Sequence, residues 1–276
     1  MLCLMVILLP ALLAPTTGEA RQPRSKSSAA GDPGGHTNRG VRYAREKKYK
    51  EAIEEFTKAI EAQPKDPKNY RNRAQAYVLN KQPKEAIADY GKLIELRPDD
   101  ADARASRGEL EMRQGEYAAA IKDLDRALEL NAKDTASLRY RAFSYLQLRQ
   151  WNKALADYDT LLKILPKDYS ALERRSYIYD QLGQNDRAIA DYTVMLEAQP
   201  KNVELYRRRG QAYRLTKNYV KAAADFRKVL ELKPGDNDAQ DRLRYVESQM
   251  PKSPTPWPKR LVRRTPAPQA SPTPAR

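Results

Sequence analysis

The stretch that decides the fold is residues 135–168, which read TASLRYRAFSYLQLRQWNKALADYDTLLKILPKD. It holds two runs in which apolar residues return every three or four positions, the spacing of one face of an α-helix. The second run stops before Pro166, because proline lacks the backbone N–H that a continuing helix needs. The stretch is therefore predicted to form two helices joined by a short turn.

The same pattern recurs along the chain every 34 residues, without an insertion or a deletion. An alanine of the second helix keeps this period, at Ala52, Ala86, Ala120, Ala154, Ala188 and Ala222. Four positions later comes a large residue, at Phe56, Tyr90, Leu124, Tyr158, Tyr192 and Phe226. A small residue of the first helix repeats in the same way, at Gly40, Ala74, Gly108, Ala142, Ser176 and Gly210. One helix pair cannot bury its apolar face alone, so the repeat predicts a stack of pairs.

An aromatic residue of the first helix completes the pattern at Tyr43, Tyr77, Tyr145, Tyr179 and Tyr213, with Glu111 as the one interruption. The whole pattern resembles the tetratricopeptide repeat family, in proteins of the bacterial secreted or periplasmic type. The resemblance covers six units, residues 33–66, 67–100, 101–134, 135–168, 169–202 and 203–236. It implies an all-α fold, a right-handed α-solenoid of six helix-turn-helix units.

The boundaries of the units carry helix-capping residues. An Asp or Asn precedes each following unit and suits the N-cap position of its first helix, at Asp66, Asp100, Asp134, Asp168 and Asn202. After the sixth unit, four apolar residues spaced 4-3-4 predict one more amphipathic helix, at Ala239, Leu243, Val246 and Met250. Residues 237–250 are therefore expected to form a solubilising helix that closes the stack.

An arginine stands just before each small residue of the first helix, and an acid follows it 16 residues later. An antiparallel helix pair brings these two positions face to face, so we predict an ion pair inside every unit. The pairs are Arg39 with Glu55, Arg73 with Asp89, Arg107 with Asp123, Arg141 with Asp157, Arg175 with Asp191, and Arg209 with Asp225. A structural role is the favoured interpretation, and the alternative is that these arginines line a ligand groove.

The N-terminal residues 1–14 form an apolar run that is shorter than the roughly 20 residues a membrane-spanning helix needs. We expect residues 1–20 to be a signal peptide, cleaved so that the mature chain starts near Glu19 or Arg21. The expected location is therefore periplasmic or secreted, with no transmembrane domain after cleavage. A retained membrane anchor, a misassigned start codon and a buried helix are the alternatives.

Two polar segments flank the repeats. Residues 21–32 lack an apolar period and are expected to be a flexible linker. Residues 251–276 carry eight prolines and six basic residues without one acid, which predicts a disordered, basic tail of polyproline II character. The tail could be a spacer, an anchor for an anionic polymer or lipid surface, or a proline-rich ligand. An exported chain would not meet intracellular nucleic acid, so nucleic acid is not an expected partner.

Catalytic and metal-binding motifs are missing from the sequence. The chain has one cysteine, Cys3, and one histidine, His36, which excludes a disulfide framework and a Cys/His zinc site. It has no glycine-rich phosphate loop, no HExxH and no nucleophile elbow. We expect no catalytic residues, no metal, no cofactor and no enzymatic activity.

The resemblance also implies a binding surface, because the first helices of successive tetratricopeptide units line a groove that holds peptides. Carrying the family's groove positions over to this chain points to Arg71, Asn72, Gln75, Arg139, Tyr140, Phe143, Arg174, Tyr177, Arg207, Arg208, Gln211 and Arg214. Acids intrude at Asp102, Glu109, Glu173 and Glu204, so the groove is mixed in charge with a basic bias. The Lys/Asn/Asn/Lys/Arg set by which some members hold a carboxylate is not in place.

Arginines interleaved with aromatic residues suit acidic or carboxylate-bearing peptides, since guanidinium binds carboxylate in a bidentate manner. The expected function is a non-catalytic protein-interaction scaffold that binds such peptides in its groove. The alternative is an envelope-associated anchoring protein whose basic tail contacts an anionic surface. The formal net charge of +15 for the whole chain would favour such a contact.

Overall fold

The computed structural model describes residues 33–251, which contain thirteen α-helices and no strand. The helices are α1 (Pro33–Arg45), α2 (Tyr49–Ala62), α3 (Pro67–Leu79), α4 (Pro83–Leu96), α5 (Ala101–Gln114), α6 (Tyr117–Leu130), α7 (Thr135–Gln147), α8 (Trp151–Ile164), α9 (Tyr169–Gln181), α10 (Asn185–Ala198), α11 (Val203–Leu215), α12 (Tyr219–Leu232) and α13 (Asn237–Ser248). Each predicted unit thus holds two helices. The expected signal peptide (1–20), the linker (21–32) and the tail beyond Pro251 lie outside the described residues.

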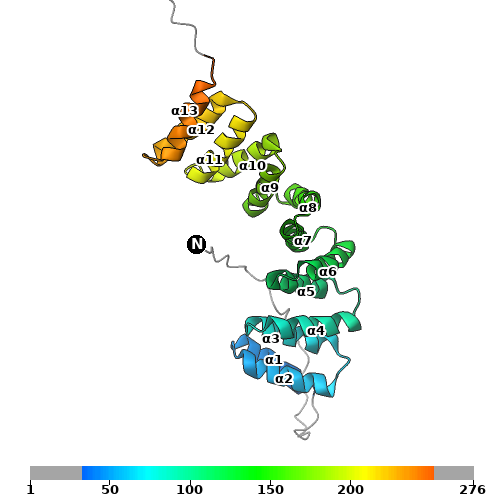
Figure 1. Cartoon of the computed structure of the whole chain (residues 1–276). Coiled ribbons are helices and arrows are strands. Elements are labelled where there is room, and N and C mark those ends of the chain that lie inside the picture. Colours follow the sequence, from blue (N-terminus) through cyan, green and yellow to red (C-terminus); the bar gives the residue numbers. More distant parts are fainter. Residues whose placement is uncertain (1–32, 252–276) are drawn as a thin grey trace, which may run out of the picture. The chain divides into compact units, whose positions relative to one another are not determined.

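The chain divides into two compact units, each larger than one 34-residue repeat. They are called unit 1, which ends at Asp89, and unit 2, which starts at Tyr90, so the boundary falls within α4. In unit 1, α1 and α2 form an antiparallel pair against which α3 packs (Figure 1). Their core consists of Ala52, Phe56 and Ala76. Gly40 lets the helices approach closely, because a Cβ there would lie 2.6 Å from Cε1 of Phe56.

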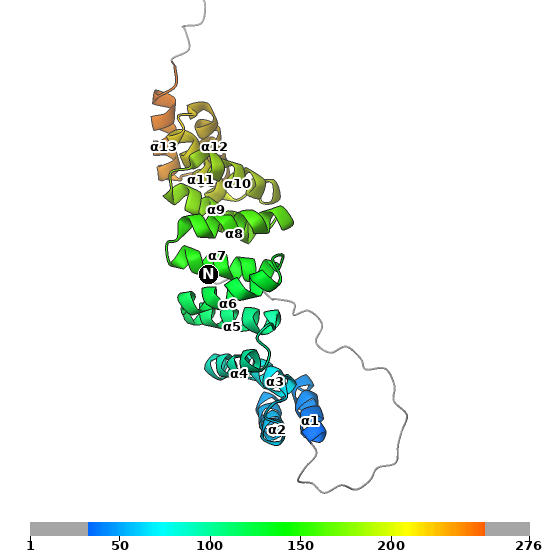
Figure 2. The same ribbon diagram turned by 90° about the vertical axis from the view of Figure 1, so that its right-hand side faces the viewer.

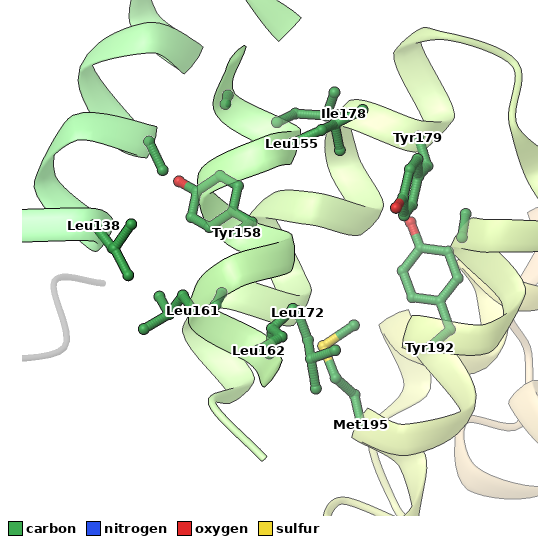
Figure 3. Close-up of a cluster of buried hydrophobic side chains, with 14 of the residues drawn as sticks. Leu138, Leu155, Tyr158, Leu161, Leu162, Leu172, Ile178, Tyr179, Tyr192 and Met195 are labelled. Carbon is green, nitrogen blue, oxygen red and sulfur yellow. The ribbon is translucent and has the colours of Figure 1, made fainter. Parts of the chain in front are cut away.

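In unit 2, helices α5 to α13 pack in chain order, each against the next (Figures 1 and 2). Their largest core surrounds Tyr158 and Tyr192, two of the large residues that repeat every 34 positions. Figure 3 shows Tyr158 among Leu138, Leu155 and Leu161. Each repeat contributes apolar residues to its neighbours, which is why the sequence period and the stack agree.

The predicted N-caps are all present. Asp66, Asp100, Asp134, Asp168 and Asn202 each accept a hydrogen bond from a backbone N–H in the first turn of the following helix. Asp236 does the same for α13, accepting from the Ala239 N–H at 3.1 Å. These caps satisfy donors that the helix itself leaves unpaired.

The predicted closing helix is α13, which ends at Ser248, two residues earlier than expected from the apolar spacing. Val246 is fully buried against Ala222, Ala223 and Phe226, with Leu243 and Met250 partly buried beside them. The opposite side carries polar residues, so α13 covers the last apolar surface of the stack. Within residues 33–251 no helix has the length and apolar character needed to cross a membrane.

Candidate functional site

The structure brings together all six arginine–acid pairs inside their units. Arg73, Arg141, Arg175 and Arg209 each donate through Nε and Nη2 to both oxygens of the aspartate 16 residues later, at 2.5–2.9 Å. Arg107 grips Asp123 in the same way, at 2.5 and 2.8 Å. In the first unit, Arg39 Nε donates to Glu55 at 2.6 Å. Bidentate geometry of this kind makes the strongest of the charge-assisted hydrogen bonds.

Most of these arginines also reach back to the preceding helix pair, a contact that sequence reasoning missed. Nη1 of Arg141 donates to Asp125 at 2.8 Å, and Nη1 of Arg175 donates to Asp159 at 2.7 Å. Thr57 and Thr193 take the same place for Arg73 and Arg209, at 3.0 and 3.2 Å. The available signal was the spacing, because each acceptor lies 16 residues before its arginine. These side chains therefore join neighbouring repeats and do not serve as free ligand-binding cations.

The pKa shifts of Arg141 and Glu55 agree with a structural role for these ion pairs. Burial lowers the pKa of Arg141, but the hydrogen bonds that it donates to Asp157 and Asp125 raise the pKa above its ordinary value. Burial also opposes ionisation of Glu55, yet hydrogen bonds from Lys58, Arg39 and His36 hold its pKa at about 2. Arg141 and Glu55 are therefore charged over the ordinary pH range.

Arg107 in the third unit is the exception. Its Nη1 faces Gly91, where the other units offer an acceptor side chain, and Glu111 replaces the tyrosine found in the other units. Oε2 of Glu111 is buried without a hydrogen-bond partner, and the nearest guanidinium atom, Arg107 Nε, lies 3.8 Å from Oε1. Burial, reinforced by the charge of Asp123, raises the pKa of Glu111 to about 7.

Two of the predicted groove arginines are tied to the next unit. Arg139 donates to Asp168 and Arg207 Nη2 donates to Asp236, at 2.7 Å for the second pair. Both aspartates are N-caps of the following helix, and both pairs are separated by 29 residues. These two arginines therefore stabilise helix starts, which lowers their availability for a ligand.

The groove positions of the sixth unit form a polar network. Arg208 Nε donates to Glu204 at 3.0 Å, while Gln211 Oε1 accepts from Arg214 at 3.0 Å and from Arg242 of the capping helix at 2.6 Å. Arg214 also lies 5.5 Å from the ring centre of Tyr245. Arg242 and Tyr245 escaped sequence reasoning, because the capping helix was read only as a cover. A pocket of about 300 Å³ here is lined by charges of both signs.

Four aromatic side chains and one arginine from α6, α7, α8 and α9 form a group that we name the α7–α9 platform: Phe143, Arg174, Tyr177, Trp151 and Tyr117. The Arg174 guanidinium lies 4.5 Å from the ring centre of Phe143. Phe143 meets the edge of Tyr117 and Tyr177 meets the edge of Trp151, with ring centres 6.2 and 6.4 Å apart. Tyr177 is 40% exposed. Within residues 33–251, Arg174 has no carboxylate ion-pair partner.

Tyr140 lies beside this platform and faces back to α5. Burial raises the pKa of Tyr140 to about 12, and the charge of Glu109 adds to the shift. Glu109 itself accepts from Arg113 Nη2 at 2.6 Å. The acid predicted to intrude into the groove is therefore balanced by its own helix.

The groove residues of unit 1 differ from those of unit 2. Arg71, Asn72 and Gln75 lie on α3, and the last two line an apolar pocket of about 180 Å³ between α1 and α3. Its other lining residues are Val41, Ala44, Arg45, Phe56, Ala76 and Leu79. Asn69 of the same helix is fully buried and accepts from Thr37 Oγ1 at 2.8 Å, which fastens α3 to α1.

No cluster of side chains suited to a metal ion occurs among the described residues. The acids of these surfaces are instead held by arginines or cap helices. The chemistry that the arrangement offers is recognition, through guanidinium groups, aromatic faces and one apolar pocket.

Comparison with known proteins supports the fold. A family model for the tetratricopeptide repeat matches residues 71–135, 141–203 and 179–237, and a second tetratricopeptide repeat model matches residues 33–66. The chain belongs to the tetratricopeptide repeat family, whose members are generally non-catalytic and bind protein or peptide partners. No curated protein matches the chain.

Several solved structures share the fold. The C-terminal part of a TPR repeat-containing protein from Cytophaga hutchinsonii is 19% identical, with a TM-score of 0.63, over 78% of this chain and 89% of that one. YrrB, described as a TPR protein with an unusual peptide-binding site, is 22% identical, with a TM-score of 0.59, over 68% and 97%. MamA from Desulfovibrio magneticus RS-1 is 21% identical, with a TM-score of 0.53, over 62% and 97%. The predicted all-α tetratricopeptide solenoid class is thereby confirmed.

Proposed function

We propose that this protein is a non-catalytic interaction scaffold that binds acidic peptide segments on the first-helix face of unit 2, centred on the α7–α9 platform. The observation that carries the proposal is the position of Arg174, which stacks on Phe143 and has no carboxylate partner within residues 33–251. Arg139, Arg207 and Arg208 each hold an acid of this chain, so they contribute less.

The physical argument combines charge and surface. A guanidinium attracted to the face of an aromatic ring keeps its N–H donors for a carboxylate and loses little conformational freedom when that carboxylate binds. Tyr177 adds exposed aromatic surface next to this cation. A peptide that carries Asp or Glu beside an apolar group would satisfy both features.

The test is fluorescence anisotropy with the labelled peptide GSEEAEESG and its glutamine counterpart GSQQAQQSG. We expect the acidic peptide to bind more tightly, and Arg174→Ala to weaken its binding about tenfold, or ~1.4 kcal/mol. The matched control is Arg126→Ala, because Arg126 lies on a second helix and pairs with Asp99 and Glu129. Equal loss in both variants, or equal binding of both peptides, would contradict the proposal.

Two further proposals, export of the protein and binding of its C-terminal tail to an anionic surface, are based on the sequence. We infer export to the periplasm or the medium from the apolar run of residues 1–14, and N-terminal sequencing of the purified protein should find Glu19 or Arg21 first. The six basic residues of 251–276 would bind an anionic surface, and that binding should fall steeply with added salt. An intact Met1 in the exported fraction, or salt-independent binding, would oppose these two inferences.

A further inference from the structure

The pocket between α1 and α3 of unit 1 remains open because one position of the repeat carries a short side chain. Asn72 of α3 stands at this position and lines the pocket. The residues at the same position of the later repeats are Ser106, Tyr140, Arg174, Arg208 and Arg242. Ser106 is also short, whereas the four residues from the fourth repeat onward have long side chains.

In unit 2 each of these long side chains reaches back onto the preceding helix pair. Tyr140 lies near Glu109, Arg174 stacks on Phe143, and Arg242 donates to Gln211 at 2.6 Å. Glu109, Phe143 and Gln211 hold the position that Val41 holds in unit 1. Arg208 similarly lies beside Tyr192, the counterpart of Phe56. From the fourth repeat onward, long side chains therefore cover the surface that stays open in unit 1.

The open surface is apolar and has the size of a side chain. Val41, Ala44, Phe56, Ala76 and Leu79 form most of the lining of a pocket of about 180 Å³. Since the ring of Tyr140 covers the corresponding place between α5 and α7, a ring or a branched aliphatic group matches the space. Water in an apolar pocket of this kind is readily displaced by such a group.

The charge around the pocket is basic. Helices α1 and α3 together carry Arg39, Arg42, Arg45, Lys68, Arg71 and Arg73 and not one acid. Arg39 and Arg73 hold Glu55 and Asp89, whereas Arg45 lines the pocket and forms no ion pair within residues 33–251. A partner segment that carries acids beside its apolar residue would complement this rim.

We propose that the pocket between α1 and α3 is an anchor site, which takes one phenylalanine- or leucine-sized side chain of an acidic segment of a partner protein. The proposal deepens the function proposed above and rests on it, because it adds an apolar pocket for the same class of acidic segment. Asn72 and Gln75 stand at the mouth with side-chain amides able to pair with the backbone of the bound segment.

The experiment uses labelled peptides GSEEXEESG in which X is Ala, Leu or Phe, with the full chain and fluorescence anisotropy. Asn72→Tyr closes the pocket with the side chain that unit 2 has at the same position, so the variant should keep its melting temperature. We expect the Phe and Leu peptides to bind at least tenfold more tightly than the Ala peptide. Asn72→Tyr should abolish this difference and leave binding of the Ala peptide unchanged.

Two control variants distinguish closure of the pocket from the mere addition of a ring to α3, and binding at the pocket from binding at the platform. Val78→Tyr adds the same ring to α3 at an exposed position outside the pocket, and should preserve the preference for Phe and Leu. Arg174→Ala should weaken binding of the Ala peptide, which depends on the platform, and should leave the tighter binding of the Phe and Leu peptides at the pocket unchanged. Equal binding of the Phe and Ala peptides, or an unchanged preference in Asn72→Tyr, overturns the anchor site. Loss of the Arg174 effect alone overturns the platform and leaves the anchor site standing.

Discussion

The arginines of the third and fourth units occupy the same position of the repeat but have different surroundings. Arg141 in the fourth unit grips Asp157, reaches Asp125 in the preceding helix pair and lies 6.0 Å from the ring centre of Tyr145. Arg107 in the third unit grips Asp123, but Gly91 offers no second acceptor. A buried carboxyl, Glu111, takes the place of the tyrosine.

The difference shows that the ion pair inside a unit and the link between units are separate properties. The internal pair needs only the 16-residue spacing within one helix pair. The link needs a suitable residue on the preceding pair and a compatible neighbour on the arginine's own helix. The third unit keeps the first property and lacks the second.

The largest expected effect comes from breaking the internal pair of the fourth unit. Asp157→Asn leaves the half-buried Arg141 with only the more exposed Asp125, and should lower the free energy of unfolding by about 3–5 kcal/mol. Thermal and urea unfolding followed by circular dichroism measure the change. Lys163→Gln on the same helix is the control, and equal melting temperatures for the two variants would refute a structural role.

Glu111 should make stability depend on pH. Its pKa is about 7 in the folded protein against an ordinary 4.5, so the folded state holds the proton more tightly. The contribution of Glu111 to the free energy of unfolding is therefore complete below pH 4.5. It falls by at most about 3 kcal/mol as the pH rises through 7, and it is constant at higher pH.

Glu111→Gln removes this charge and should flatten that part of the stability profile. The variant should be more stable than the parent above pH 7 and similar to it at pH 4. Urea midpoints at several pH values measure the effect, with the exposed Glu129→Gln as the control. Parallel profiles for parent and Glu111→Gln would show that the carboxyl is hydrated and ordinary.

Removing the link between units should cost less than removing an internal pair. Asp125 is 44% exposed, so Asp125→Asn should lower the free energy of unfolding by about 0.5–1 kcal/mol. The loss should fade in high salt, unlike that of Asp157→Asn. A loss of stability as large as that of Asp157→Asn would mean that Asp125 and Asp157 contribute equally.

The smallest expected effect comes from supplying the third unit with the missing acceptor. Gly91→Thr places a hydroxyl where Thr57 and Thr193 serve other arginines, and the added Cβ meets only the flexible end of Arg107, at 3.3 Å. Gly91→Val has the same shape without the hydroxyl. The threonine variant should exceed the valine variant in stability by about 0.5 kcal/mol, and equal melting temperatures would contradict the bond.

Much of the fold and part of the candidate site could be predicted because they depend on short spacings. N-caps such as Asp168 lie next to the helix that they cap, and Arg141 and Asp157 share one helix pair. The bond from Arg139 to Asp168 was missed, although its 29-residue spacing repeats, because an arginine on the groove face was read as a ligand-binding group. The open pocket at Asn72 was missed because it is defined by what neighbouring side chains leave uncovered.

The sequence by itself determined the period, the helix pairs, their caps, the closing helix and the arginine–acid pairs. Each of these depends on residues close together along one unit. Only the tertiary structure decided which arginines are neutralised, that Oε2 of Glu111 is buried without a hydrogen-bond partner, and that unit 1 has an open pocket beside Asn72. The physical reason is that long side chains choose among several neighbours, and those neighbours come from adjoining units whose packing sets burial and distance.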